Sequence, residues 1–321
     1  MDEARRHSNR LARAPLAGKA TATKEMRLAH HTYAVAGLRV TSDLPMPGLL
    51  TVDGTDASTG APDVEIARAI LAPPPATADD PLAEMSFEID GLMRMSMRHG
   101  ATLLYDPVAG APPDDIALYL GGTGFGTLLH QRGMVLLHAS AVRIGDRAAL
   151  FCGPSGAGKS TLATALVDAG HDHIADDFCA IDFAADGSAM VAPDGRRHKL
   201  WDSAITGLAA GERRGGAVRS DMLKYYVDPA RVITRPIRIG AIFDLAADDE
   251  TNIEPLSALE SVALVQANAY RPNLVALMQQ QRLYFDAAVR LGRHCRFARL
   301  TRALNYGVMS EQVASIERAM A

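Results

Sequence analysis

The nine residues at positions 153–161, which read GPSGAGKST, constrain the fold of this chain more than any other stretch. A glycine, four residues, a second glycine, a lysine and then serine or threonine form the pattern of a phosphate-binding loop. The apolar run Ala148–Cys152 precedes the loop as a buried strand would, and Thr161–Val167 follows it with helical character. Gly170 stands where a left-handed cap would end that helix. This order of strand, loop and helix predicts an α/β fold; the alternative is an ordinary glycine-rich turn.

Each position of the loop has a physical role in binding phosphate. Glycines permit the backbone angles that turn consecutive amides inward, and the positive end of the following helix adds a favourable field. We expect Lys159 to reach the β- and γ-phosphates and Ser160 to place its hydroxyl on Mg²⁺. The predicted nucleotide-binding residues are Gly153, Pro154, Ser155, Gly156, Ala157, Gly158, Lys159, Ser160 and Thr161.

Two adjacent carboxylates, Asp176 and Asp177, follow the predicted loop helix and are bracketed by hydrophobic residues. Such a pair can bind Mg²⁺ and can take a proton from a substrate hydroxyl. The alternative is a turn with solvated aspartates. Asp244, in the apolar run Ile239–Leu245, is expected to end a strand and is the rival carboxylate for the metal site.

His138 is the one polar ring in the apolar run Met134–Ile144, which is predicted to be a single buried strand. A lone buried histidine is usually structural. This one lies on the strand beside the strand that leads into the loop, so it is a candidate site residue.

Composition limits the classes of function. The chain has 321 residues, 48% of them hydrophobic, with a net charge of −4 and a pI near 6.2, so nothing in its overall charge favours nucleic acid or membrane binding. Cys152, Cys179 and Cys295 are far apart and lack metal-ligand spacing, which favours reduced thiols in a cytosolic protein. No run is long and apolar enough for a membrane span, and no secretory signal is evident. We therefore expect a cytoplasmic protein; homo-oligomerisation stays open.

The chain divides into three predicted parts. Residues 1–27 form a basic tail that is expected to be disordered, with a tether for an acidic partner as the alternative. Residues 28–110 form a β-rich N-terminal domain, in which Asp90-Gly91 between two alternating runs predicts a hairpin. Residues 111–321 contain the phosphate-binding loop and form the larger domain.

Other segments have two interpretations each. The glycine run at 121–126 lies inside a predicted helix from Asp114 to about Leu129, where close packing is favoured over phosphate binding. The glycine-rich stretch at 207–216, with nearby Arg213, Arg214, Arg219 and Lys224, is either a mobile loop that presents cations to a substrate or a solvated basic loop. Further helices are expected from Ser257 to Ala269, from Asn273 to about Gly292, and from Ser310, as its cap, to Met320.

His138, the loop at 153–161 and the pair Asp176-Asp177 together resemble the catalytic domain of HPr kinase/phosphorylase, over roughly residues 133–245. That family phosphorylates a protein serine with a phosphate-binding loop. The resemblance implies a P-loop core similar to phosphoenolpyruvate carboxykinase, with ATP and Mg²⁺ as cofactors. It also implies Asp176 as general base, Asp177 as a partner near the metal together with Ser160, and His138 as a hydrogen-bonding neighbour of the base.

The chain departs from that family at Arg197–Trp201, where the family's glutamate- and arginine-containing signature would stand, and this departure weighs against phosphorylase activity and against HPr as substrate. Its layout, with Gln131-Arg132-Gly133 and Leu137–Val142, is similar to HPr-kinase-related proteins of peptide-modification gene clusters, some of them similar to kinases of lasso-peptide precursors. The implied function is an ATP- and Mg²⁺-dependent serine kinase acting on a peptide or small protein, such as the C-terminal serine of a lasso-type precursor. A small-molecule kinase and a non-catalytic ATP-binding regulator are the alternatives.

Overall fold

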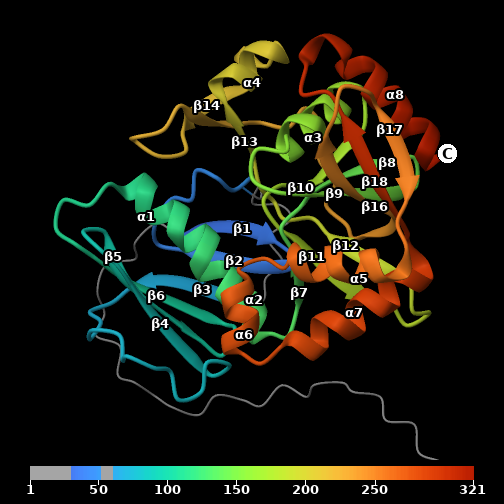
Figure 1. The fold of residues 1–321 in the computed structure, drawn as a ribbon. Coiled ribbons are helices and arrows are strands. Elements are labelled where there is room, and N and C mark those ends of the chain that lie inside the picture. The colour runs from blue at the N-terminus through green and yellow to red at the C-terminus, as the bar shows by residue number, and fades with distance from the viewer. Residues whose placement is uncertain (1–29, 52–60) are drawn as a thin grey trace, which may run out of the picture.

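The computed structural model describes residues 30–51 and 61–321. The predicted disordered tail at 1–27 and most of the predicted loop at 51–62 lie outside the described residues. The described chain is a mixed α/β structure with an N-terminal sheet, a larger central sheet and a small third sheet (Figure 1). No helix in the two described ranges is both long and apolar enough to cross a bilayer.

The N-terminal sheet contains the predicted Asp90-Gly91 hairpin, whose Met93, Met95 and Met97 are almost fully buried. Alternation along the strand sends these three side chains to one face, where they form core. The strands follow the order β1-β2-β3-β6-β5-β4, with bounds β1 His31–Val35, β2 Leu38–Ser42, β3 Val64–Arg68, β6 Thr102–Pro107, β5 Met93–Arg98 and β4 Glu84–Ile89.

The segment Tyr33–Val40 is not a single strand but a tight hairpin between β1 and β2. The chain turns at Ala36 and Gly37, whose φ values are 53° and 76°. Glycine adopts this left-handed region readily, but alanine rarely does, so Ala36 concealed the turn from sequence reasoning.

The helical segment predicted from Asp114 to about Leu129 packs on the N-terminal sheet. Its glycines lie where other side chains approach: a Cβ at Gly124 would stand 2.6 Å from Leu103, and one at Gly126 would stand 2.6 Å from Tyr270. Close packing therefore explains this glycine run. The segment comprises α1 Pro113–Tyr119, a π-helical stretch Leu120–Gly124 and α2 Phe125–Gln131.

One hydrophobic cluster contains Met95 of the N-terminal sheet, Phe125 of α2 and Phe178 beside the central sheet. The core is thus continuous across position 110, where the sequence analysis divides the chain. The N-terminal sheet and α1–α2 consequently hold one edge of the site region in place.

The central sheet carries the phosphate-loop segment. Its long strand β16 lies parallel to β9 and to β18, while the remaining strand pairs are antiparallel. The main path is β10-β8-β9-β16-β12-β11-β7, with β18 joining β16 to β17. The bounds are β7 Val135–Leu137, β8 Ser140–Ile144, β9 Arg147–Cys152, β10 Asp172–Ala175, β11 Cys179–Phe183, β12 Ala189–Ala192, β16 Ile237–Ala247, β17 Asn252–Pro255 and β18 Arg296–Arg302.

Helices cover both faces of this sheet (Figure 1). Along β9, Leu150 belongs to the cluster under α5 and α7, whereas Ala149 and Phe151 belong to the cluster under α3 and α8. A strand buried on both faces is a continuous apolar run, which explains Ala148–Cys152. The helices are α3 Lys159–Asp168, α5 Ala258–Ala267, α7 Gln281–His294 and α8 Met309–Met320.

The prediction of one strand over Met134–Ile144 is wrong, because the chain breaks at His138 and Ala139 into β7 and β8. The two halves have different neighbours: β7 pairs with β11, and β8 pairs with β9. The backbone amide of His138 instead donates to the carbonyl of Asn268 at 2.7 Å. The break places the His138 ring at the site, as described below.

The basic stretch near 207–224 belongs to a small sheet, and its arginines are paired. Arg213, Arg214 and Arg219 form ion pairs with Asp168, Asp202 and Asp221 at 2.7, 2.8 and 2.9 Å, respectively. The prediction of a loop that presents these cations to a substrate is therefore not supported by their contacts. The sheet order is β13-β15-β14, with β13 His198–Trp201, β15 Lys224–Val227 and β14 Arg214–Ala217, and α4 Asp202–Gly207 lies beside it.

The C-terminal helices differ from the prediction in two places. The expected helix from Asn273 to Gly292 is two helices, α6 (Pro272–Leu277) and α7, because Gln279 adopts a φ of 55° between them. The last helix starts at Met309 after Val308, so Ser310 is not its cap. By contrast, Ser257 and Glu260 form the predicted capping box at the start of α5.

Candidate active site

The segment between β9 and α3 has the backbone of a loop that folds around a small anion. Gly153, Gly156 and Gly158 have φ values of 139°, 88° and 79°. Side chains are disfavoured in this region, so glycine is required here if the amides are to turn inward. Helix α3 begins at Lys159 directly after the loop, which directs the positive end of the helix toward it.

Lys159 is buried, and its ammonium group lies within the loop. Nζ donates to the carbonyl oxygens of Gly153 at 2.7 Å and Pro154 at 3.2 Å. Burial lowers the pKa of Lys159, although the nearby acidic groups, including Asp176, oppose this. The cation therefore stands at the loop with neutral oxygen partners that an anionic oxygen could replace.

Two side chains from distant parts of the chain brace the loop. Arg302, at the end of β18, donates Nη2 to the carbonyls of Ala157 at 2.9 Å and Gly158 at 3.2 Å. The Oδ1 atom of Asn268 accepts from the amide of Gly153 at 3.0 Å. A Cβ at Gly158 would collide with the Arg302 guanidinium. These contacts fix both ends of the loop.

Asp176 lies below the loop, with only 2% of its surface exposed. Ser140 donates to its Oδ1 at 2.7 Å, the backbone amide of Lys199 donates to its Oδ2 at 3.1 Å, and the hydroxyl of Ser160 also donates to the carboxylate. Burial raises the pKa of Asp176, but His198 and the two hydroxyls outweigh it, so the net direction is downward. Asp176 is thus an ionised buried group whose oxygens are already engaged.

Asp177 faces the open side of the site, with a quarter of its side chain exposed. Its φ of 91° is left-handed, which turns it away from Asp176. Burial would raise the pKa of Asp177, but the Lys199 ammonium, 3.0 Å from Oδ2, and then Arg196 and His138 hold it well below the usual range. A left-handed non-glycine residue costs about 1–3 kcal/mol, and such strain is characteristic of functional sites.

His138 lies against Asp177. Its Nδ1 is 2.8 Å from the carbonyl oxygen of Asp177, which can only accept, so Nδ1 carries the hydrogen and Nε2 is free to accept. Nδ1 is also 3.7 Å from Oδ1 of the Asp177 carboxylate. Burial, followed by the charge of Lys159, lowers the pKa of His138, so the ring is neutral near pH 7.

A buried polar cluster supports the two aspartates from below. Asp194 accepts from the amides of Asp176 at 2.8 Å and Arg196 at 3.0 Å. Burial raises the pKa of Asp194 to about 8, against the opposing effects of the Arg196 guanidinium and the two amides. Arg196 itself lies over the Phe178 ring and donates to the carbonyl of Gly121. This network connects the Asp pair to the π-helical stretch.

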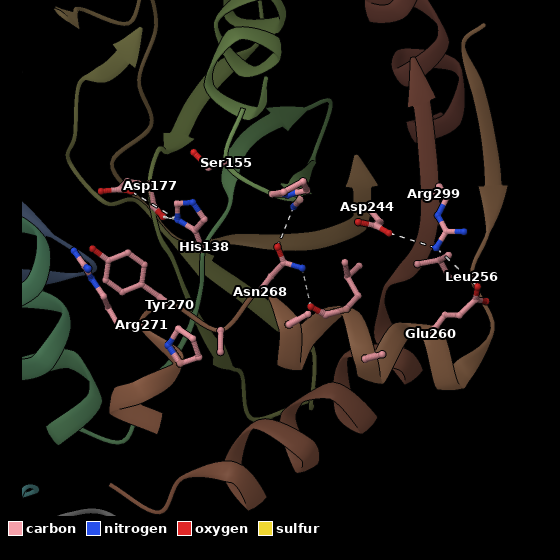
Figure 2. Close-up of a pocket in the computed structure, with 17 residues that line it drawn as sticks. His138, Ser155, Asp177, Asp244, Leu256, Glu260, Asn268, Tyr270, Arg271 and Arg299 are labelled. Carbon is pink, nitrogen blue, oxygen red and sulfur yellow. Dashed lines mark hydrogen bonds and ion pairs between the residues drawn. The ribbon is translucent and has the colours of Figure 1, made fainter. Parts of the chain in front are cut away.

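A cavity of about 780 Å³ opens beside the loop, within the range of small-molecule sites. Its wall includes Gly153, Pro154 and Ser155 of the loop together with His138 and Asp177. Figure 2 shows His138, Asp177, Tyr270 and Arg271 at one end and Asp244, Arg299 and Glu260 at the other. Apolar residues between the ends are Leu256, Ala263, Leu264, Ala267, Ala269 and Pro272.

Asp244, the rival carboxylate, lies at the far end of this cavity. The expectation that Asp244 ends a strand is wrong, because β16 continues to Ala247. Asp244 lies opposite Cys152, the last residue before the loop, and 3.5 Å from the Arg299 guanidinium. Arg299 is also 3.9 Å from Glu260. Asp244 is therefore close to the loop in the sheet but points toward an arginine and away from the Asp pair.

The residues beside the loop include donors of the kind that Mg²⁺ and a nucleotide use. No group of three or more His, Cys, Asp or Glu side chains within the described ranges is arranged to hold a metal ion. Mg²⁺ with a nucleotide needs only one or two protein oxygens, because phosphate and water supply the others. Of the predicted metal donors, the Ser160 hydroxyl lies against Asp176, and the partly exposed Asp177 carboxylate faces the cavity. The positive φ values of Gly153, Gly156 and Gly158 are those that would let the loop amides turn toward an anion such as phosphate.

The predicted candidates His138, Lys159, Asp176 and Asp177 lie close enough for their charges to affect one another. Sequence reasoning assigned no role to Ser140, Asn268 or Arg302. Ser140 carried a weak signal, since it follows His138 by two residues in an apolar run. Asn268 and Arg302 contact the loop across separations of 115 and 144–145 residues, which no local pattern reveals.

The chain matches no protein-family model and no curated protein. Among solved structures, it has a distant likeness to an enzyme. That enzyme is the HPr(Ser) kinase/phosphatase from Coxiella burnetii, with 11% identity and a TM-score of 0.29 over 58% of this chain and 97% of that one.

Proposed function

We propose that this protein is an ATP-dependent phosphotransferase that phosphorylates a hydroxyl group. The observation that carries the proposal is the shared cavity: the first loop residues and the ionised carboxylate of Asp177 line the same 780 Å³ space. A phosphoryl donor held by the loop and an acceptor hydroxyl in that space would be next to each other, which is the main requirement of phosphoryl transfer.

The contacts favour exchanging the roles of the two aspartates implied by the family resemblance. A general base must reach the acceptor hydroxyl. Asp176 is buried and already accepts from Ser140, Ser160 and the Lys199 amide, whereas Asp177 lines the cavity. We therefore assign the base to Asp177. Asp176 positions the Ser160 hydroxyl at the start of α3.

In the proposed reaction, Asp177 accepts the proton of the acceptor hydroxyl as its oxygen bonds to the γ-phosphorus of ATP and the bond from that phosphorus to the β–γ bridging oxygen breaks. ADP keeps the electron pair of the broken bond. Lys159 and the loop amides stabilise the charge on the transferred group. The Ser160 hydroxyl, positioned by Asp176, would hold Mg²⁺, which when bound supplies further charge neutralisation. The strongly lowered pKa of Asp177 fits a base that accepts the proton late, together with transfer of the phosphoryl group.

For the acceptor, we propose a serine of a peptide or small protein, with the C-terminal serine of a lasso-type precursor as the particular candidate implied by the sequence resemblance. The cavity also favours a second candidate, a small hydroxylated molecule. Polar side chains from several elements converge on it, namely Asp244, Glu260, Tyr270, Arg271 and Arg299. Convergent polar groups around an apolar wall are typical of small-molecule sites.

Mass spectrometry tests the peptide proposal. The native protein is incubated with Mg-ATP and each peptide encoded beside its gene. A gain of one phosphate on serine, absent with Lys159→Ala, supports the proposal. Phosphate on a small hydroxylated compound, with every peptide unmodified, would favour the second candidate. Tight ATP binding without transfer to any acceptor would instead favour a nucleotide-binding regulator.

A further inference from the structure

We infer that Arg271 binds an anionic group of the acceptor, a carboxylate, at the end of the cavity that contains Asp177. This inference rests on the proposed function, since it takes the cavity as the acceptor site. Arg271 is exposed at the cavity wall. Within residues 30–51 and 61–321, it forms no ion pair with a carboxylate, unlike Arg299 at the opposite end.

Arg271 is held in position by its backbone and by its neighbour. It adopts a left-handed φ of 54° immediately before Pro272, the first residue of α6. Its guanidinium carbon lies 5.5 Å from the centre of the Tyr270 ring, and its guanidinium group donates a hydrogen bond to the Tyr270 hydroxyl. A planar guanidinium held in this way can offer two parallel N–H groups to a carboxylate.

Tyr270 connects this arginine to the candidate base. The Tyr270 and His138 ring centres are 6.2 Å apart, and His138 in turn contacts Asp177. Gly126 makes room for Tyr270, because a Cβ there would stand 2.6 Å from the ring. An acceptor bound to Arg271 would therefore lie at the same end of the cavity as the base (Figure 2).

The charges at the two ends of the cavity set the orientation of the acceptor. Asp177 is neutralised by Lys199 at 3.0 Å, which leaves Arg271 as an uncompensated positive charge at that end. At the other end, Asp244 and Glu260 share the single guanidinium of Arg299. A carboxylate is attracted to the first end and repelled from the second. An acceptor with its carboxylate near its hydroxyl fits this arrangement, as in a C-terminal serine or a small hydroxy acid.

The experiment measures binding by ligand-observed NMR titration of the full chain with four probes. N-acetyl-alanyl-serine is compared with its C-terminal amide, and D-glycerate is compared with glycerol. We expect at least one carboxylate to bind about 10-fold or more tighter than its neutral partner, as for one lost hydrogen bond to a charged group. Arg271→Gln should remove the difference, and Arg290→Gln should keep it, because Arg290 lies on α7 over Phe183, outside the cavity wall.

The larger preference identifies the source of the carboxylate: a chain terminus if the peptide pair differs more, and a small hydroxy acid if glycerate and glycerol differ more. Equal binding within both pairs, no binding of either carboxylate, or a preference that survives in Arg271→Gln would overturn the inference. Binding is measured without transfer, so a chain that prefers carboxylates yet never moves phosphate would refute the proposed function alone.

Discussion

Asp176 and Asp177 are neighbours in the chain but face opposite surroundings: Asp176 is buried below the phosphate loop, and Asp177 lines the cavity beside it. The left-handed backbone at Asp177 produces this separation. Two carboxylates that look equivalent in the sequence are thereby given different tasks. One positions Ser160, and the other is available to an acceptor.

The first prediction separates these tasks. Asp177→Asn removes the proton acceptor but keeps the size, so the rate of transfer should fall by about 10²-fold or more while ATP binding persists. Asp176→Asn should instead lower stability by about 1–3 kcal/mol, because an amide nitrogen cannot accept from the donors around it. Steady-state kinetics and thermal unfolding of both variants check this. Loss of transfer confined to Asp176→Asn would identify Asp176 as the general base.

The second prediction concerns pH. The pKa of Asp177 lies well below its usual range because of Lys199, so the base is ionised throughout the neutral range. In Lys199→Met that pKa should rise toward or above the usual value of about 3.9, and the acidic limb of kcat/KM should move to higher pH. The direction of this pKa change is fixed, since losing a neighbouring cation disfavours the carboxylate anion. A limb that stays in place or moves to lower pH would exclude Asp177 as the titrating base.

The lowered pKa of Asp177 also affects the stability of the folded state. A depressed carboxylate pKa stabilises the folded state above the unfolded value of about 3.9, and this contribution is lost as the pH falls through the folded value. Lys199→Met should therefore lose stability near pH 7 and lose less near pH 2. Denaturant titrations at the two pH values measure the difference.

The third prediction tests the loop backbone with a matched pair. Gly145 and Gly158 have φ values of 61° and 79°, but only at Gly158 would a Cβ collide, with the Arg302 guanidinium. Gly145→Ala should cost about 1–2 kcal/mol for the left-handed conformation and keep nucleotide binding. Gly158→Ala should cost more and abolish nucleotide binding. Calorimetric titration with Mg-ATP distinguishes them, and equal ATP affinity in the two variants would argue against a loop built to hold phosphate.

The fourth prediction concerns Lys159. Its ammonium is the only charged donor that the loop pattern places inside the loop, so Lys159→Ala should weaken ATP binding by about 10- to 100-fold, as for a lost hydrogen bond to a charged group. Arg282→Ala is the control, because that guanidinium pairs with Asp286 along α7 at 3.6 Å, away from the loop. Unchanged ATP affinity in Lys159→Ala would remove the basis of the loop assignment.

Local sequence patterns predicted those parts of the structure that depend on local backbone chemistry. The strand–loop–helix order around Gly153–Thr161 and the Asp90-Gly91 hairpin follow from glycine positions and apolar runs. The sequence identified His138 as a candidate site residue but did not predict its position. The break in its strand results from different pairing partners on each side. The sequence left two interpretations of the arginines near 213–219 open, because their aspartate partners include one as distant in sequence as Asp168.

The most direct test of phosphoryl transfer by this protein is an assay with ATP labelled with ¹⁸O in its γ-phosphoryl group. The native protein, Mg²⁺ and labelled ATP are incubated with a panel of peptides ending in serine, small hydroxy acids and sugars, and the products are searched by mass spectrometry. We predict a labelled phosphate ester on at least one acceptor and its near absence with Asp177→Asn. The contrary result is Mg-ATP bound by the native protein without a labelled product, or equal product from Asp177→Asn.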